Sequence, residues 1–236
     1  MSTNKCLVIG APRSGTSLLA GMIGAHPDVG MLREDYSGAM GRIVGKKVAG
    51  NKLCIPNQIS FGNSWWNRLL RRYGFHLYRG RSVVSLEEYL VDPQLVVVAI
   101  VRRPYAVINS MCKRGGQSRS QAYRRWARSI EILSEVETGY SEKLLIVPFE
   151  LLVESPRATI DAVATHLNLP FHPAMLQGHE HTSSYDHENK GIDPERAQVN
   201  EKLKQRYPVH ENYPGEVAMY HALRERNRSK LVRSSQ

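Results

Sequence analysis

The sequence predicts an α/β fold with a central, mostly parallel sheet flanked by helices. Short apolar runs typical of buried strands alternate with segments whose apolar residues recur every three or four positions, as in amphipathic helices. The longest apolar run, 95–101, is almost entirely aliphatic and β-branched. Such a run suits a central strand that is covered on both faces. At 236 residues the chain can build one ordinary core, and we expect a single domain over 1–236.

The chain begins with a strand, a loop and a helix. The run 5–9 predicts a buried strand that enters a tight loop at Gly10. The apolar spacing that follows predicts a helix over 17–25, which ends before Pro27 because proline disfavours helix at the preceding residue. Two further short strands are expected, at 29–32 and 52–55.

The alternation continues after the long aliphatic strand at 95–101. Pro104 fits the first turn of a following helix, and apolar steps of three and four predict a helix over 121–136. A strand at 143–147 and a helix at 155–167 are expected next. After about Phe171 the sequence looks irregular, with weak helical patterns near Glu201 and Val217.

Composition restricts the class of partner and the compartment. The 32 Lys and Arg residues exceed the 22 Asp and Glu residues by 10, which favours a nucleotide, a nucleic acid, a membrane surface or an acidic glycan. No apolar run approaches the ~20 residues of a membrane-spanning helix. We expect a cytoplasmic protein with three reduced thiols, none in a zinc-like spacing: Cys6, Cys54 and Cys112.

The segment 10–17, Gly-Ala-Pro-Arg-Ser-Gly-Thr-Ser, has the features of an anion-binding loop. It connects the first predicted strand to the first predicted helix, whose N-terminal N–H groups attract anions. Gly10 and Gly15 have the spacing of a Walker A loop, but Thr16 stands where that loop needs lysine. Arg13 supplies the cation instead. The strand 95–101 ends in two arginines and not in a Walker B aspartate, so a Mg²⁺-dependent triphosphatase is disfavoured.

The loop resembles the 5′-phosphosulfate loop of sulfotransferases that use 3′-phosphoadenosine 5′-phosphosulfate (PAPS). Leu18-Leu19 and His26-Pro27 resemble the bacterial and Golgi branches of that family, and the resemblance spans roughly 5–170. It implies a P-loop-containing sulfotransferase-like fold, with an acceptor-side region of uncertain structure over 171–236. It also implies that the donor's 5′ end is bound by Pro12, Arg13, Ser14, Gly15, Thr16 and Ser17.

A second anchor for the donor follows the aliphatic strand. The family recognises the 3′-phosphate of PAPS, and of the product PAP, with an arginine at a strand end and a serine one helix segment later. Arg102 and Ser110, eight positions apart, resemble this pair. Ser110 lies under two turns into the predicted helix, and an arginine can bind phosphate in bidentate fashion. Some members add a C-terminal basic-glycine loop, for which Lys190-Gly191 is the candidate. We interpret Glu150 as structural, with a helix cap as one such role.

The resemblance also suggests which groups carry the chemistry. Cytosolic members place a histidine base shortly after a lysine, but Lys52 is followed by Cys54 in the histidine position. The other branch, which includes tyrosylprotein and heparan-type enzymes, uses a glutamate just after the second strand. Glu34 is therefore the expected general base, and Asp35 is its nearest rival. Lys52 is assigned to the transferring sulfonate or bridging oxygen, and Arg13 to the leaving 5′-phosphate.

Several questions stay open at this level. The alternatives are a P-loop nucleotide kinase and a non-catalytic nucleotide- or nucleic-acid-binding protein, the latter because residues 113–128 are basic. The acceptor is a hydroxyl or an amine, on a carbohydrate or a small metabolite. Leu18 replaces the tryptophan that stacks on the donor in cytosolic members, so the adenine could be held by Trp65, Trp66 or Tyr123. The histidines of 179–187 are irregularly spaced, and we expect no metal site.

Overall fold

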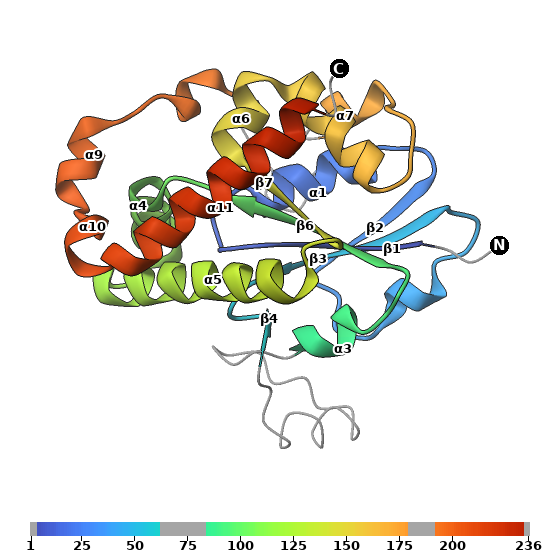
Figure 1. Ribbon diagram of the computed structural model, residues 1–236, viewed down its shortest axis with the longest axis horizontal. Coiled ribbons are helices and arrows are strands. Elements are labelled where there is room, and N and C mark those ends of the chain that lie inside the picture. Colours follow the sequence, from blue (N-terminus) through green and yellow to red (C-terminus); the bar gives the residue numbers. More distant parts are fainter. Residues whose placement is uncertain (1–3, 62–83, 179–191, 234–236) are drawn as a thin grey trace.

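The computed structural model describes residues 4–61, 84–178 and 192–233 and confirms the α/β fold. Within these ranges, five strands form one sheet in the order β2-β3-β1-β6-β7, and all its neighbouring strands are parallel (Figure 1). The strands are β1 (Asn4–Gly10), β2 (Val29–Arg33), β3 (Val48–Cys54), β6 (Leu95–Val101) and β7 (Leu144–Pro148). Each strand expected from the sequence is present, and the long aliphatic run lies inside the sheet.

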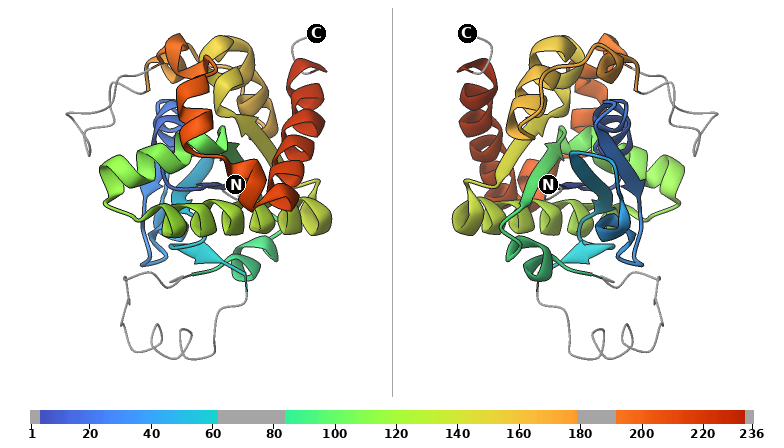
Figure 2. Two further views of the ribbon diagram at one scale, coloured as in Figure 1. Left: turned by 90° about the vertical axis from the view of Figure 1, so that its left-hand side faces the viewer. Right: turned by 90° about the vertical axis from the view of Figure 1, so that its right-hand side faces the viewer.

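Helices cover both faces of this sheet (Figure 2). One layer contains α1 (Thr16–Gly24), α6 (Phe149–Glu154) and α7 (Pro156–His166), and the other contains α4 (Pro104–Gly115) and α5 (Arg119–Tyr140). Successive side chains of β1 alternate between the two layers. Cys6 and Val8 pack against the first layer, and Leu7 and Ile9 pack against the second. The core therefore consists of two apolar clusters, one on each face of the sheet.

Helix ends follow the local signals in the sequence. Pro104 is the first residue of α4, as expected, and α4 ends at Gly116, which adopts a left-handed conformation. A capping box between Ser118 and Gln121 starts α5, which therefore begins before the predicted 121. Asn168, with φ of 55°, follows the end of α7.

Shorter elements and the C-terminal helix complete the described chain. They are η1 (Ala39–Arg42), β4 (Ile59–Ser60), β5 (Val84–Ser85), α3 (Leu86–Leu90), α8 (Ala174–Gln177), η3 (Pro194–Ala197), α9 (Glu201–Arg206), α10 (Val209–Asn212) and α11 (Pro214–Arg233). The weak helical patterns near Glu201 and Val217 correspond to α9 and α11. The expectation of an irregular tail after Phe171 was wrong at α8 and η3, which are too short to show a helical period.

The C-terminal helix protects an edge of the sheet. α11 packs against β7 and α5 and crosses in front of them in Figure 1. Asn227, whose side chain is buried, accepts a hydrogen bond at 3.1 Å from the backbone N–H of Ile146 on β7. Because an edge strand exposes unpaired backbone groups, this contact satisfies a donor that the sheet leaves open. In the part of the chain that the structure describes, no helix is long and apolar enough to cross a membrane.

Candidate functional site

The loop between β1 and α1 requires glycine at two positions. A Cβ atom on Gly10 would lie 2.6 Å from the carbonyl oxygen of Ile100, so the loop could not approach β6. Gly15 has φ of 107°, and a Cβ atom there would lie 2.7 Å from Cδ2 of Phe149. Both contacts are shorter than real carbon contacts allow. The two glycines therefore let the loop curl tightly in front of the sheet.

Polar contacts inside the loop hold its shape. The backbone N–H and the hydroxyl of Ser14 both donate to the carbonyl oxygen of Ala11, at 3.1 and 2.6 Å. The side chains of Ser14 and Thr16 are buried, whereas Pro12, Arg13 and Ser17 are half-buried. Arg13 has φ of 72°, and left-handed residues of this kind are typical of backbone concavities that bind anions. The sequence-predicted loop thus has the form of an anion cradle at the start of α1.

Three predicted donor-site residues meet in front of this loop. The Nε of Arg13 donates to Oγ of Ser110 at 3.1 Å, although 97 positions separate them. Nη1 of Arg102 donates to the carbonyl oxygen of Arg13 at 3.5 Å. The guanidinium of Arg102 also lies 4.1 Å from the centroid of the Phe149 ring, a cation–π contact. The structure therefore brings Arg13, Arg102 and Ser110 into one place.

This cluster has a strongly positive electrostatic environment. The pKa of Arg102 is lowered to about 10, chiefly by burial; Glu150 opposes this shift, and Arg196, Arg13 and Arg114 contribute to it. In the sequence, Arg114 is noted only as part of the basic segment 113–128, and Arg196 is not singled out. Arg114 could have been found because it follows Ser110 by four positions on one helix face. No local signal marks Arg196, which reaches the cluster from η3.

Glu34 and Lys52 form an ion pair on the neighbouring strands. Arg33 pairs in register with Lys52, so the chain after β2 passes directly beside Lys52. The backbone N–H of Glu34 donates to the carbonyl oxygen of Lys52 at 2.9 Å, and Nζ of Lys52 lies 2.5 Å from Oε1 of Glu34. The side chain of Lys52 is 5% exposed and that of Glu34 is 31% exposed. The pair therefore has a buried cation and a carboxylate that solvent, or a ligand, can reach.

Neighbouring groups keep Lys52 protonated. Burial lowers the pKa of Lys52, but Cys54 and Glu34 together raise it above its ordinary value. Cys54 lies two residues further along β3, and side chains two apart share one face of a strand. Its Sγ lies 3.8 Å from Oγ1 of Thr16 in the loop. The thiol thus connects the ion pair to the anion cradle.

Asp35, the rival of Glu34, is engaged elsewhere. Its carboxylate accepts hydrogen bonds from the hydroxyl of Ser37 at 2.7 Å and from the backbone N–H of Ala39 at 3.0 Å. Burial raises the pKa of Asp35, but these hydrogen bonds outweigh it and leave the pKa below its ordinary value. The side-chain amide of Asn51 on β3 also accepts a hydrogen bond from the backbone N–H of Asp35 and donates one to its carbonyl oxygen. Asp35 therefore supports the loop after β2.

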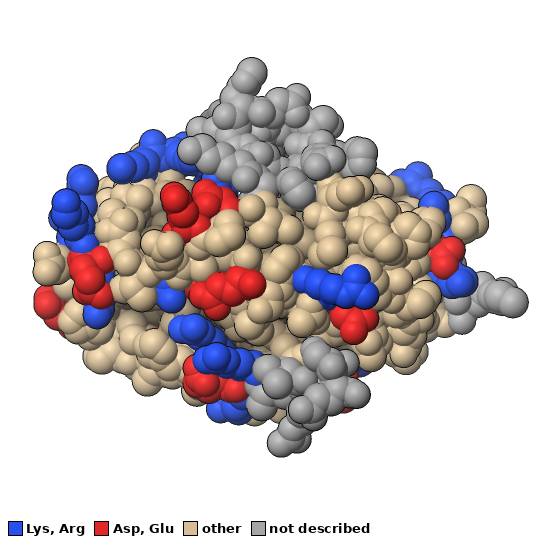
Figure 3. All heavy atoms as spheres, turned by 90° about the horizontal axis from the view of Figure 1, so that it is seen from above, with Lys and Arg blue, Asp and Glu red and all other residues tan. Residues whose placement is uncertain are grey.

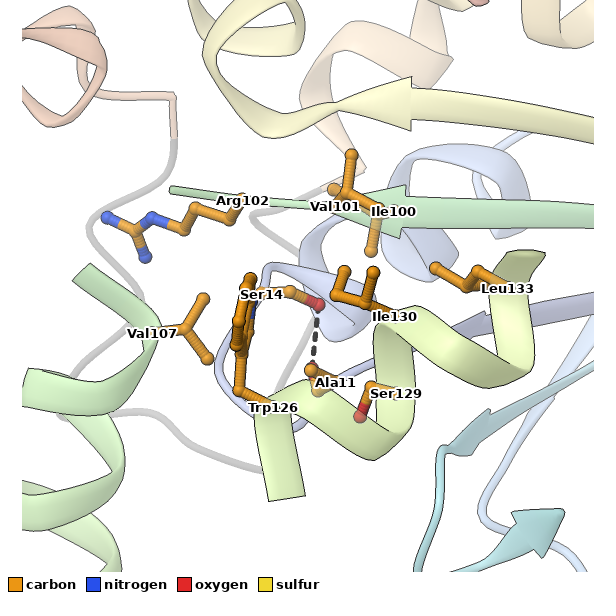
Figure 4. A pocket seen from close by; sticks show the side chains of 10 residues that line it. All are labelled: Ala11, Ser14, Ile100, Val101, Arg102, Val107, Trp126, Ser129, Ile130 and Leu133. Atoms are coloured by element: carbon orange, nitrogen blue, oxygen red, sulfur yellow. Dashed lines mark hydrogen bonds between the residues drawn. The ribbon is translucent and has the colours of Figure 1, made fainter. Parts of the chain in front are cut away.

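A small cavity lies behind the loop. Its volume is about 10 Å³, room for roughly one water molecule. Figure 4 shows Trp126, Ile130 and Leu133 of α5 on one side and the Ser14–Ala11 hydrogen bond on another, while Arg102 extends away from them. The cavity is far too small for a nucleotide. A ligand of the loop would lie on its outer side, with Arg102.

Other predicted candidates lie outside the cluster or outside the described residues. Lys190 and Gly191, the histidines of 179–187, and Trp65 and Trp66 all fall outside the described ranges. Tyr123 is a core residue that stacks on Tyr213, with ring centroids 5.8 Å apart. Among residues 4–61, 84–178 and 192–233, no group of three or more His, Cys, Asp or Glu side chains could hold a metal ion. Figure 3 shows Lys and Arg side chains, interspersed with Asp and Glu, at the end of the molecule where α9 lies and elsewhere on the same face. The strands point their carboxyl ends toward the α9 end (Figure 1).

The chain is similar to one known group of proteins. Residues 86–173, which include Arg102, Ser110 and Phe149, match the model of the sulfotransferase family. No curated protein matches the sequence. In fold, the chain is similar to mouse sulfotransferase SULT7A1 complexed with PAP, with a TM-score of 0.56, 13% identity, and 96% of this chain and 90% of that chain covered.

Two sulfotransferase domains from other sources have the same fold. The domain from the curacin biosynthetic pathway has a TM-score of 0.55 at 16% identity, with 90% of this chain and 98% of that chain covered. The domain from the Synechococcus PCC 7002 olefin synthase has a TM-score of 0.53 at 17% identity, with 90% and 95% covered. The architecture described above is therefore that of sulfotransferases.

Proposed function

We propose that the chain is a sulfotransferase that transfers a sulfonate group from PAPS to a hydroxyl or amine of an acceptor, because residues 86–173 match the sulfotransferase family model and the fold is similar to that of sulfotransferases. One observation carries the proposal. Two sets of groups that this reaction needs lie at the same edge of one sheet: the cluster of Arg13, Arg102 and Ser110, and the ion pair of Lys52 and Glu34. The presence of PAP in the similar mouse structure supports the choice of donor.

The donor site fits a nucleotide with phosphates at two positions. The loop at the start of α1 would hold the 5′-phosphosulfate, and Arg102 with Ser110 would hold the 3′-phosphate. Among the described residues, the buried Nε of Arg102 has no hydrogen-bond partner within the protein, which supports a role for this side chain in binding an acceptor group such as a phosphate oxygen. Arg13 lies in the loop and bonds Ser110, so it would neutralise charge between the two phosphate positions.

The ion pair supplies a base and a cation for the transfer. PAPS, when bound, provides a sulfonate whose bond to the 5′-phosphate oxygen breaks as the acceptor oxygen or nitrogen bonds to sulfur. Glu34 would accept the proton that the acceptor loses. Lys52 would exchange its contact with Glu34 for one with the sulfonate or the bridging oxygen, and Arg13 would balance the charge on the leaving 5′-phosphate.

The acceptor is the less defined half of the reaction. The partial exposure of Glu34 agrees with a site that is open on the acceptor side. We propose a carbohydrate or a small metabolite as the acceptor. A screen of such compounds with labelled PAPS would identify it, because only a true acceptor becomes labelled in proportion to enzyme.

Thermal unfolding in the presence of different ligands tests the donor assignment. We expect PAP alone, without a metal ion, to raise Tm, because a ligand that binds only the native state stabilises it by about 2.7 kcal/mol at a hundred times its Kd. ATP with Mg²⁺ would do so if the chain were a nucleotide kinase, and an oligonucleotide if it were a nucleic-acid-binding protein. A rise in Tm with either of these, and none with PAP, would contradict the proposal.

A further inference from the structure

We propose that Phe149 and Glu150 are positioning residues of the donor site, which hold Arg102 and the start of α4 in the geometry that binds the 3′-phosphate. The inference rests on the proposed function, because it assumes that Arg102 receives this phosphate. Neither residue was expected to take part in donor recognition. Both are almost fully buried, at 2% and 1% exposure, so they would act through their neighbours.

Phe149 contacts two parts of the site with one ring. Its ring centroid lies 4.1 Å from Cζ of Arg102, and its Cδ2 fills the space where Gly15 lacks a side chain. Arg102 thus has an aromatic surface beneath its planar guanidinium, which restricts the orientations open to a long side chain. The same ring limits how far the loop can move. A nucleotide held by the loop at its 5′ end and by Arg102 at its 3′-phosphate needs both of these positions to be kept.

Glu150 supports the helix that carries Ser110. Its Oε1 accepts a hydrogen bond at 3.0 Å from the backbone N–H of Arg103, the residue before the first turn of α4. Helix N-termini leave such donors unpaired, and no side chain of α4 itself caps this end. The carboxylate is also the first neighbouring charge that raises the pKa of Arg102 against the effect of burial. Glu150 therefore fixes where α4 begins and places a negative charge near Arg102.

The register of the sheet places these two residues. Val101 pairs with Pro148 across β6 and β7, so Arg102 and Arg103 leave one strand where Phe149 and Glu150 leave the next. Phe149 faces Arg102, and Glu150 faces the backbone of Arg103. The side chain of Arg103 is used differently, since it donates to the carbonyl oxygen of Ala197. One dipeptide thus supports both the phosphate-binding arginine and the helix behind it.

The test compares PAP with 5′-AMP, which lacks the 3′-phosphate, by calorimetry on the full chain. We expect Phe149→Leu to weaken PAP binding about fivefold more than 5′-AMP binding, the scale of a partly buried cation–π contact, because the loop contact of the ring affects both nucleotides and the Arg102 contact affects only PAP. Phe149→Tyr, which retains a ring, should keep the wild-type ratio of PAP affinity to 5′-AMP affinity. In an Arg102→Ala background, Phe149→Leu should have no further effect on this ratio.

Variants of Glu150 separate its hydrogen bond from its volume. Glu150→Gln retains an acceptor for the N–H of Arg103. We expect this variant to keep at least half of the wild-type ratio of PAP affinity to 5′-AMP affinity. Glu150→Ala removes the acceptor and should reduce the ratio. Leu152→Ala is the matched control, because Leu152 is a fully buried residue of the same helix, two positions after Glu150. It should lower Tm without changing the ratio.

The outcomes distinguish this inference from the proposed function. If wild-type protein fails to bind PAP, the proposed function is wrong. Suppose that wild-type protein binds PAP and that Arg102→Ala loses the preference for PAP over 5′-AMP. If Phe149→Leu then keeps this preference, the positioning role is wrong. The positioning role would also be wrong if Leu152→Ala lowered the ratio of PAP affinity to 5′-AMP affinity as much as Phe149→Leu does. A general loosening of α6 would then explain both results.

Discussion

Nζ of Lys52 on β3 lies 2.5 Å from Oε1 of Glu34, the first residue after the adjacent parallel strand β2. The lysine is buried and the carboxylate is partly open to solvent. A pair with a buried cation and an accessible carboxylate suits a reaction in which the lysine contacts the sulfonate donor and the carboxylate contacts the acceptor.

Glu34→Gln should lower turnover by about 10²–10⁴-fold, because an amide cannot accept the acceptor's proton. PAP affinity should stay within about twofold, since Glu34 lies outside the arginine cluster. Turnover is measured with labelled PAPS and calorimetry gives the affinity. Asp35→Asn is the control and should retain activity, because Asp35 bonds Ser37 and Ala39. Wild-type turnover in Glu34→Gln would remove Glu34 as the base.

Lys52→Met should lower kcat by about 10²–10³-fold, the range for removing one donor to developing charge. Its raised pKa also predicts a pH profile. A raised pKa favours the protonated form, so the charge of Lys52 is lost only above its ordinary value of 10.5. Wild-type kcat should therefore show no loss due to Lys52 between pH 7 and pH 10. A fall in that range that disappears in Lys52→Arg would contradict this prediction.

Arg102→Ala should weaken PAP binding by about 10- to 100-fold, as expected for a lost charge-assisted hydrogen bond. Binding of 5′-AMP should change little, because that nucleotide has no 3′-phosphate. Arg13→Ala should weaken the binding of both, since Arg13 lies in the loop that would hold the 5′ group.

Calorimetry with both nucleotides checks this pattern. Arg128→Ala is a suitable control, because Arg128 pairs with Glu131 and Glu135 on the surface of α5. If neither Arg13→Ala nor Arg102→Ala loses PAP affinity, the donor site lies elsewhere.

Gly15→Ala should both destabilise the fold and abolish donor binding. The positive φ costs about 1–2 kcal/mol for a residue with a side chain, and the added methyl would press on the ring of Phe149. Gly139→Ala should instead raise Tm slightly, because Gly139 is a helical residue of α5 with nothing within 4 Å of an added Cβ. Equal effects of the two substitutions on Tm and on PAP affinity would show that the Gly15 conformation is unimportant.

The sequence by itself determined the strands, the main helices and the loop of this protein. These features depend on local patterns: the aliphatic run of β6, the apolar period of α5, and the glycine spacing of 10–17. Glu34 and Lys52 were also recognisable as candidates, because the resemblance to sulfotransferases marks these positions near strand ends. Local signals of this kind need no knowledge of which strands are neighbours.

Tertiary structure alone decided which of these residues meet. The contact of Lys52 with Glu34 depends on the register of β2 and β3, and that of Arg13 with Ser110 on how α4 packs against the loop. Arg196, Phe149 and Asn227 carry no pattern that marks their roles in sequence. Each acquires its role because the parallel sheet and its packing bring distant segments together, and the spacing of residues along a chain does not specify that approach.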